Sequence, residues 1–199
     1  MLIPFGWYFP TLCLVWNNHG RIPKTTAEAH IHEFLSLTPP VTVATPYANE
    51  ITSNPPEEET SRPDLVTQDE LNFRSLILGA THRAAGEFGP SRQFLVKAAT
   101  ENINDVEGKW IVPLAYFELA VLELQEIRAL EVQDNAPSSS GGLKARWLTA
   151  LRLASEHLDK STASLGDTDL SSRLDARIPM VRISLRPPRI LRSYDKLYS

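Results

Sequence analysis

The chain has very little cysteine and no excess of positive charge. Cys13 is its single cysteine, which excludes an internal disulfide framework and any cysteine-based zinc site. The formal net charge of −4 argues against general nucleic-acid binding, which needs a concentrated basic surface. Only the C-terminal tail is basic, with Arg182, Arg186, Arg189 and Arg192. We therefore expect a protein of a reducing compartment such as the cytosol.

The short motifs that mark common active sites are also missing. No two of the five histidines are spaced four apart on a helix, and Glu33 does not complete an H-E-x-x-H motif. The chain has no G-x-S-x-G elbow, no P-loop and no dinucleotide fingerprint. We predict no catalytic, cofactor-binding or metal-binding residue and a non-enzymatic role. A small molecule or metal bound to the purified chain would support an enzyme instead.

An uninterrupted apolar run long enough to cross a membrane is absent as well. Residues 1–16, MLIPFGWYFPTLCLVW, are apolar, but Pro4, Gly6 and Pro10 interrupt them and no positive charge precedes them. This pattern favours a buried helix that spans residues 10–20, rather than a signal peptide or a membrane anchor. A membrane-peripheral adaptor anchored by residues 1–16 stays open as an alternative.

Proline-rich and serine-rich segments divide the chain. Thr25 and Glu28 form the pattern of a capping box, which predicts a short helix before Pro39 and an N-terminal helical hairpin over 1–38. Residues 39–66 have no apolar period and predict a disordered linker, whose Glu57–Glu59 run is a solvated segment rather than an acidic binding site. Residues 134–143 predict a second flexible insertion, and 187–199 form a basic tail.

Helical patterns are strongest over residues 67–186. Thr67 and Glu70 predict a second capping box at the start of a helix over about 68–87, and Pro90 predicts the start of its partner. Residues 67–104 are therefore predicted to form an antiparallel helical hairpin. Residues 113–132 and 144–164 predict a second hairpin of the same kind.

The most apolar long stretch is WIVPLAYFELAVLELQEI, residues 110–127. Glu118, Glu123 and Glu126 would make a membrane span costly, and Pro113 is placed like the first residue of a helix. The apolar residues of this helix lie on two sides, Phe117, Ala120, Val121, Leu124 and Ile127 on one and Ala115, Leu119, Leu122 and Leu130 on the other. We expect neighbours on both sides, as for an inner helix of a stacked array.

A partial repeat pattern favours the same architecture. Leu78 and Gly79, then Gly86, then Leu95 and Ala98, stand at positions of the tetratricopeptide pattern. His82, Ser91 and Ile103 depart from it, standing in place of the expected Tyr, Ala and closing Pro. We predict an all-α fold of tetratricopeptide-like hairpins stacked in an array, with about seven helices, two disordered insertions and no sheet.

Two longer segments point to a family. WIVPLAYFELAVLEL and, after an insertion, DLSSRLDARIPMVRISL resemble the C-terminal signature of the fungal inclusion body clearance proteins and their animal tetratricopeptide repeat 39 relatives. LCLVWNNHGRIP resembles the Tyr-Leu-Trp-Asn segment of the same family. The resemblance covers most of residues 7–186.

The resemblance implies a role in clearing misfolded-protein inclusions through contact with lipid-droplet proteins. It implies a cytoplasmic and nuclear location, with the outer mitochondrial surface as a lesser alternative. Members of the family are several times longer, so the chain is expected to be their C-terminal part. Its apolar N-terminal edge is then a cut surface, through which we expect it to self-associate.

One buried ion pair is expected from the two signatures together. Glu118 lies in so apolar a segment that its carboxylate needs a partner. Arg173 and Arg177 are four residues apart and share a face of the last helix, so we predict that one of them pairs with Glu118. The alternative is two solvated arginines and a carboxylate bonded locally. Pro179 is expected to kink the helix after Ile178.

Overall fold

The computed structural model of the chain describes residues 22–48, 65–101, 109–133, 140–165 and 171–184. Across these ranges the protein is all-helical and has no strand, as the sequence predicts. The six described helices are α2 (Lys24–Leu35), α4 (Gln68–Ala85), α5 (Phe88–Thr100), α6 (Ile111–Gln133), α7 (Ser140–Ser164) and α8 (Ser171–Ser184). About seven were expected, and the helix predicted over 10–20 lies outside the described residues.

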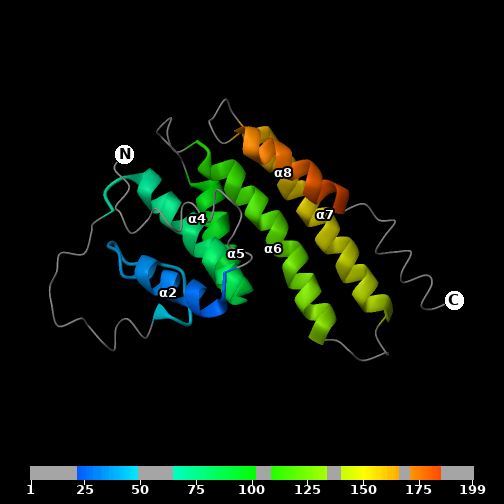
Figure 1. Ribbon diagram of the computed structural model, residues 1–199, viewed down its shortest axis with the longest axis horizontal. Helices are drawn as coiled ribbons and strands as arrows, with labels where there is room; N and C mark the ends of the chain where they lie inside the picture. Colours follow the sequence, from blue (N-terminus) through cyan, green and yellow to red (C-terminus); the bar gives the residue numbers. More distant parts are fainter. Residues whose placement is uncertain (1–21, 49–64, 102–108, 134–139, 166–170, 185–199) are drawn as a thin grey trace.

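Helices that follow one another in the chain pack side by side. α4 and α5 form one hairpin, α6 and α7 form another, and α6 also packs on α5 (Figure 1). α2 covers a further side of α4, and α8 lies against α7 and α6. One hydrophobic core runs from α2 to α8, so the expected N-terminal unit 1–38 does not have a separate core within its described part.

Local signals explain where the first hairpin begins and turns. The hydroxyl of Thr67 accepts a hydrogen bond from the backbone of Glu70, whose carboxylate accepts one from Thr67, so the predicted capping box is confirmed. α4 ends at Gly86, whose φ of 88° is the left-handed conformation that glycine adopts without strain. The Glu87 N–H then donates to the His82 carbonyl at 2.8 Å, and α5 begins at once.

Other helix ends differ from prediction by a few residues. α2 starts at Lys24, after Pro23, with no side-chain cap, so the capping box predicted at Thr25 is wrong. Pro113 is the third residue of α6 rather than the first, which is still within the turn whose N–H groups need no helical partner. α8 continues through Pro179 to Ser184.

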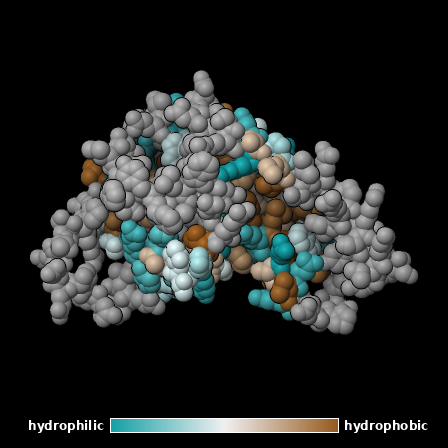
Figure 2. Space-filling view, in the orientation of Figure 1, coloured by the Kyte–Doolittle hydropathy of each residue, from teal (hydrophilic) through white to brown (hydrophobic). Residues whose placement is uncertain are grey.

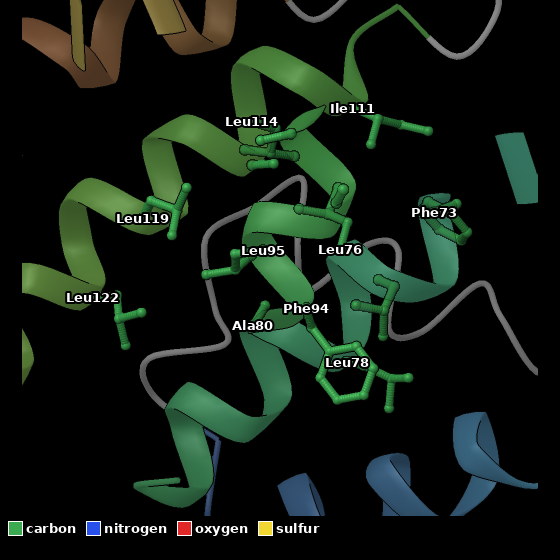
Figure 3. Close-up of a cluster of buried hydrophobic side chains, with 14 of the residues drawn as sticks. Phe73, Leu76, Leu78, Ala80, Phe94, Leu95, Ile111, Leu114, Leu119 and Leu122 are labelled. Carbon is green, nitrogen blue, oxygen red and sulfur yellow. The ribbon is translucent and has the colours of Figure 1, made fainter. Parts of the chain in front are cut away.

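α4 lies at the centre of the fold although it is not the most apolar helix. Every residue from Asn72 to Arg83 is buried, because α2, α5 and α6 surround this stretch. Figure 3 shows how Leu76, Leu78 and Ala80 of α4 meet Phe94 and Leu95 of α5, with side chains of α6 alongside. The buried polar residues of α4 must therefore find partners on other elements.

α6 has neighbours on two sides, as its apolar pattern predicts. Ala115, Phe117, Leu119, Ala120, Leu122 and Ile127 are all buried, between α5 on one side and α7 on the other. The prediction is wrong for Leu130, which is 36% exposed. α6 is 23 residues long and α5 only 13, so α6 extends beyond the end of its neighbour.

The prediction of disorder is wrong in part for each of the two insertions. Residues 39–48 pack on the helices, with Thr45 and Tyr47 buried, and Leu65 is buried next to α4. The second insertion was expected to extend to residue 143, but α7 already begins at Ser140. Residues 49–64 and 134–139 lie outside the described residues, so the prediction is not tested there.

His82 explains why residues 39–48 pack. Its Nδ1 lies 2.7 Å from the carbonyl oxygen of Leu78, which can only accept, so Nδ1 carries the proton. Nε2 then accepts a hydrogen bond from the Thr45 hydroxyl at 2.9 Å. Burial lowers the pKa of His82 to about 4, although the bond to Leu78 opposes this. The imidazole is therefore neutral and fully hydrogen-bonded at neutral pH.

The substitution Gly79→Ala should destabilise the fold by about 1–3 kcal/mol, because an added methyl group overpacks a tight helix crossing. A Cβ at Gly79 would lie 2.5 Å from Cγ of Leu95 and 3.2 Å from its backbone nitrogen. The matched control is Gly142→Ala, since a Cβ there meets nothing within 4 Å and alanine favours a helix. Urea unfolding should show changes of opposite sign in the unfolding free energy of the two variants. A neutral or stabilising Gly79→Ala would contradict the close approach of the two helices at Gly79.

Lowering the pH from 6.5 to about 4 should remove about 3 kcal/mol of stability through His82. The pKa of His82 in the folded chain is lower than the ordinary histidine value of 6.5, so the unfolded chain binds more protons in this window. The contribution is fully present above pH 6.5 and is lost as the pH falls. Chemical unfolding at several pH values should show this slope in the wild-type chain and a flatter one in His82→Gln. Equal slopes would assign the pH dependence to other groups.

Candidate functional site

Gly79 and Leu95, two residues of the predicted repeat pattern, lie at the crossing of α4 and α5, whereas Gly86 caps the end of α4. Leu78 is fully buried, and Gly79 allows Leu95 to approach the α4 backbone closely. The Ser91 hydroxyl donates to the Gly79 carbonyl at 2.8 Å across the same crossing. Serine stands here in place of alanine because its hydroxyl has a backbone acceptor within reach. These residues position the two helices against each other.

The second hairpin contains the same kind of hydrogen bond between its two helices. The Ser161 hydroxyl on α7 donates to the Pro113 carbonyl on α6 at 2.7 Å, and Ser161 is fully buried. In both hairpins a serine on the second helix therefore bonds to a backbone carbonyl of the first. Pro113 thus has a role in the contact between the two helices besides its place in the first turn of α6.

Glu118 has a partner, and that partner is Arg83 rather than the predicted Arg177. Its Oε2 lies 2.5 Å from a terminal nitrogen of Arg83 on α4, and both side chains are 1% exposed. The other terminal nitrogen of Arg83 donates to Gln125 at 2.9 Å. The pair joins α4 to α6 and not α6 to the last helix. Arg177 lies on α8, and the side chain of Arg173 lies outside the described residues.

A signal for Arg83 was present in the sequence. Leu76, Gly79, Ala80 and Arg83 recur at three-residue and four-residue spacings, so Arg83 continues a stripe that packs against other helices. A basic residue in such a stripe needs an acid in the core. The last helix docks instead through Leu174 and Ile178, which are buried, and through an ion pair from Arg182 to Asp159 at 2.6 Å.

Arg92 on α5 holds the next two carboxylates of α6. It forms ion pairs with Glu123 and Glu126, and the contact with Glu126 is 2.5 Å. His157 on α7 also approaches Glu123, with 3.8 Å between Nε2 and Oε1. Burial alone would raise the pKa of Glu123, but hydrogen bonds from His157 and Arg92 hold it below its ordinary value. Glu123 therefore stays ionised and links three helices.

An apolar groove lies beside this network, between α6 and α7. Its volume is about 310 Å³. Ile127, Leu130, Ala150 and Leu153 supply its apolar surface, while Glu123 and Glu126 stand on the α6 side and Arg146 on the α7 side. The groove thus combines an apolar floor with walls of opposite charge.

The groove lies where α6 and α7 project beyond the shorter hairpin. At about 1.5 Å per residue, α6 is about 35 Å long and α5 about 20 Å long. Figure 2 shows this projecting part at the lower right, with a hollow between it and the part formed by α2, α4 and α5. Leu130, Val132 and Leu148 on the projecting part are 36%, 67% and 48% exposed. No described helix covers this part.

The one hydroxyl–imidazole hydrogen bond among the described residues is a poor candidate for catalysis. Thr45 and His82 resemble a nucleophile and its base, but they are 8% and 0% exposed. The rings of Tyr47 and Phe94 pack on the imidazole and close it off. A pKa of about 4 also makes His82 a weak base at neutral pH.

The described residues show neither a metal site nor a membrane-spanning helix. They contain no group of three or more His, Cys, Asp or Glu side chains that could hold a metal ion. No described helix combines the length and the hydropathy that a membrane crossing requires. The groove is the described feature with the clearest capacity to bind another molecule.

Comparison with known proteins found no family model, no curated protein and no solved structure that matches the chain.

Breaking the Arg83–Glu118 pair should cost about 3–5 kcal/mol for either Arg83→Gln or Glu118→Gln, because each leaves a buried charge without its partner. A double-mutant cycle should give a coupling energy above about 1 kcal/mol. The control cycle is the exposed pair Arg152 and Glu156, which are 63% and 49% exposed and should couple by less than about 0.5 kcal/mol.

A third cycle tests the earlier assignment directly. Glu118→Gln combined with Arg177→Gln should be additive in unfolding free energy. Coupling in this cycle, together with additivity in the Arg83 cycle, would contradict the pairing seen in the structure.

Proposed function

We propose that this chain is a non-enzymatic helical-repeat scaffold that binds other proteins. Its helices are arranged as tetratricopeptide-like hairpins, α4 with α5 and α6 with α7. The close Gly79–Leu95 crossing and the sequential packing of the helices support this arrangement. Because each hairpin contacts mainly its neighbours, such an array is extended and offers long surfaces to partners.

The groove between α6 and α7 is the observation that carries the binding proposal. The groove has an apolar floor and a volume of about 310 Å³, and it lies on the projecting part of the array. The occupant that fits it is an amphipathic helix of a partner protein, with an apolar stripe toward Ile127 and Leu130. A basic residue of that helix would face Glu126, and an acidic one would face Arg146.

The resemblance to the inclusion body clearance family suggests which partners to test. In that family the role is clearance of misfolded-protein inclusions through contact with lipid-droplet proteins. The same role in the cytosol and nucleus is our proposal for this chain. A membrane-peripheral adaptor anchored by residues 1–16 is the second candidate, which the apolar composition of that segment supports.

The purified chain should bind isolated lipid droplets and lose this binding when protease treatment has removed the droplet proteins. Leu130→Glu should weaken binding at least tenfold, because it places a charge in the apolar groove. Val96→Glu on α5 is the matched control: Val96 is 43% exposed and does not line the groove, so binding should be unchanged. Sedimentation with the droplets measures each bound fraction.

The outcomes separate the candidates. Equal binding to stripped droplets and to protein-free liposomes, lost on deletion of residues 1–16, would support the peripheral adaptor instead. Binding that both substitutions leave unchanged would remove the groove from the proposal. A chain that binds no droplet under any condition would contradict the family role.

A further inference from the structure

The groove between α6 and α7 has charges of opposite sign at its two ends. At the inner end, next to α5, the carboxylates of Glu123 and Glu126 share the guanidinium of Arg92. α7 runs antiparallel to α6 and brings His157 beside Glu123. Arg146 precedes His157 by eleven residues, so it lies about 16 Å nearer the free end of the hairpin. The groove is therefore acidic at its inner end and basic at its outer end.

Both charged ends are accessible from outside the fold. The Glu126 side chain is 39% exposed although it forms an ion pair, and Arg146 is exposed. The α7 wall of the groove carries Ala145, Thr149 and Leu153 at spacings of four residues, which places them in one stripe. Short side chains at the first two positions allow a second helix to approach α7 closely. The groove can thus accept a helix, and its charges select the direction in which that helix runs.

A groove with opposite charges at its ends is complementary to a copy of itself. A two-fold axis perpendicular to α7 reverses the direction of the second copy, so the basic end of each groove lies over the acidic end of the other. The α7 stripes of the two copies then meet as antiparallel helices, whose macrodipoles attract each other. Each contact occurs twice, because the same patch serves both copies.

We propose that the α6–α7 groove binds a second copy of this chain, with the two α7 helices antiparallel across a two-fold axis. Arg146 of each copy faces Glu126 of the other, and the dimer covers the apolar floor at Ile127 and Leu130. The proposal goes beyond the function proposed above and does not rest on it, because the purified chain alone is sufficient to form the dimer. A partner helix in the same groove would displace the second copy.

The contact is small, so the dimer is expected to be weak. Nine described residues line the groove, whereas a standard interface uses about 20–30 residues on each side. Interfaces at this low end belong to transient complexes. The dimer should therefore depend on concentration, and a single charge placed in the contact should have a large effect on its Kd.

Sedimentation equilibrium of the full chain measures the dimer directly. The average mass should rise from one chain towards two as the concentration increases about a hundredfold, with no larger species, because a two-fold interface closes on itself. Leu130→Glu should raise the Kd about tenfold or more, since it places a charge against the apolar floor of both copies. Val96→Glu is the matched control: Val96 is 43% exposed and does not line the groove, so the Kd should stay unchanged.

Charge exchange tests the orientation of the second copy. Arg146→Glu and Glu126→Lys should each raise the Kd about tenfold or more, because like charges then face one another across the axis. An equimolar mixture of these two variants should dimerise with a Kd within about threefold of the wild-type value, since each altered residue then faces a residue of opposite charge. A loss of folding would not be rescued by mixing, and circular dichroism confirms the helices of each variant.

Salt and an N-terminal substitution separate this dimer from association through residues 1–16. Raising the ionic strength from about 0.05 M to about 0.5 M should weaken the dimer of the wild-type chain, because its charge pairs are partly exposed and become screened. Association through an apolar edge would not weaken in this way. Leu12→Glu should leave the Kd unchanged.

Three results would overturn the proposal. The first is a wild-type chain that stays monomeric over the whole range of concentration. The second is a mixture of the two charge variants that dimerises no better than either variant alone. The third is a Kd that Leu12→Glu raises and Leu130→Glu leaves unchanged, which would assign the association to the N-terminal edge. Loss of droplet binding would bear only on the function proposed above, because none of these measurements uses droplets.

Discussion

The burial of α4 is the constraint on which the rest of the structure depends. Its central residues are surrounded by other elements, yet they include arginines, a histidine and hydroxyl groups. A buried polar group without a partner costs about 1–3 kcal/mol. The buried polar side chains of α4 therefore need hydrogen-bond partners on other elements or in the preceding turn of the helix. Arg74 bonds to residues 37 and 39, His82 to Thr45, and Arg83 to Glu118. These contacts determine what lies on three sides of α4.

α6 connects this centre to the second hairpin through its carboxylates. Glu118 pairs with α4, Glu123 with α5 and α7, and Glu126 with α5. Burying charges is costly, so such a network favours one register of the helices over others more than it adds net stability. Beyond Glu126 there is no α5 to pack against, and the same helix exposes apolar residues beside a groove. The proposed docking site is thus a consequence of unequal helix lengths.

Local patterns predicted the helices well and their surroundings poorly. Thr67 caps α4 as predicted because the signal lies within four residues. Thr25 shows the same pattern and caps nothing, since α2 begins at Lys24 and Thr25 lies inside it. The composition of residues 39–48 suggests disorder, yet they pack because Arg74 and His82 offer partners more than thirty residues away. For Glu118, the apolar surroundings predicted burial and the need for a cation, but spacing alone could not choose among arginines.

The sequence by itself determined the all-helical class, the turn of the first hairpin to within a few residues and the two-sided burial of α6, because these follow from periodicity and from residues close together in the chain. Only the tertiary structure decided that α4 is the central helix, that Arg83 is the partner of Glu118, and that Leu130 lines an open groove. Those outcomes depend on which helices meet and on how far each extends past the next, and residues distant in sequence set both.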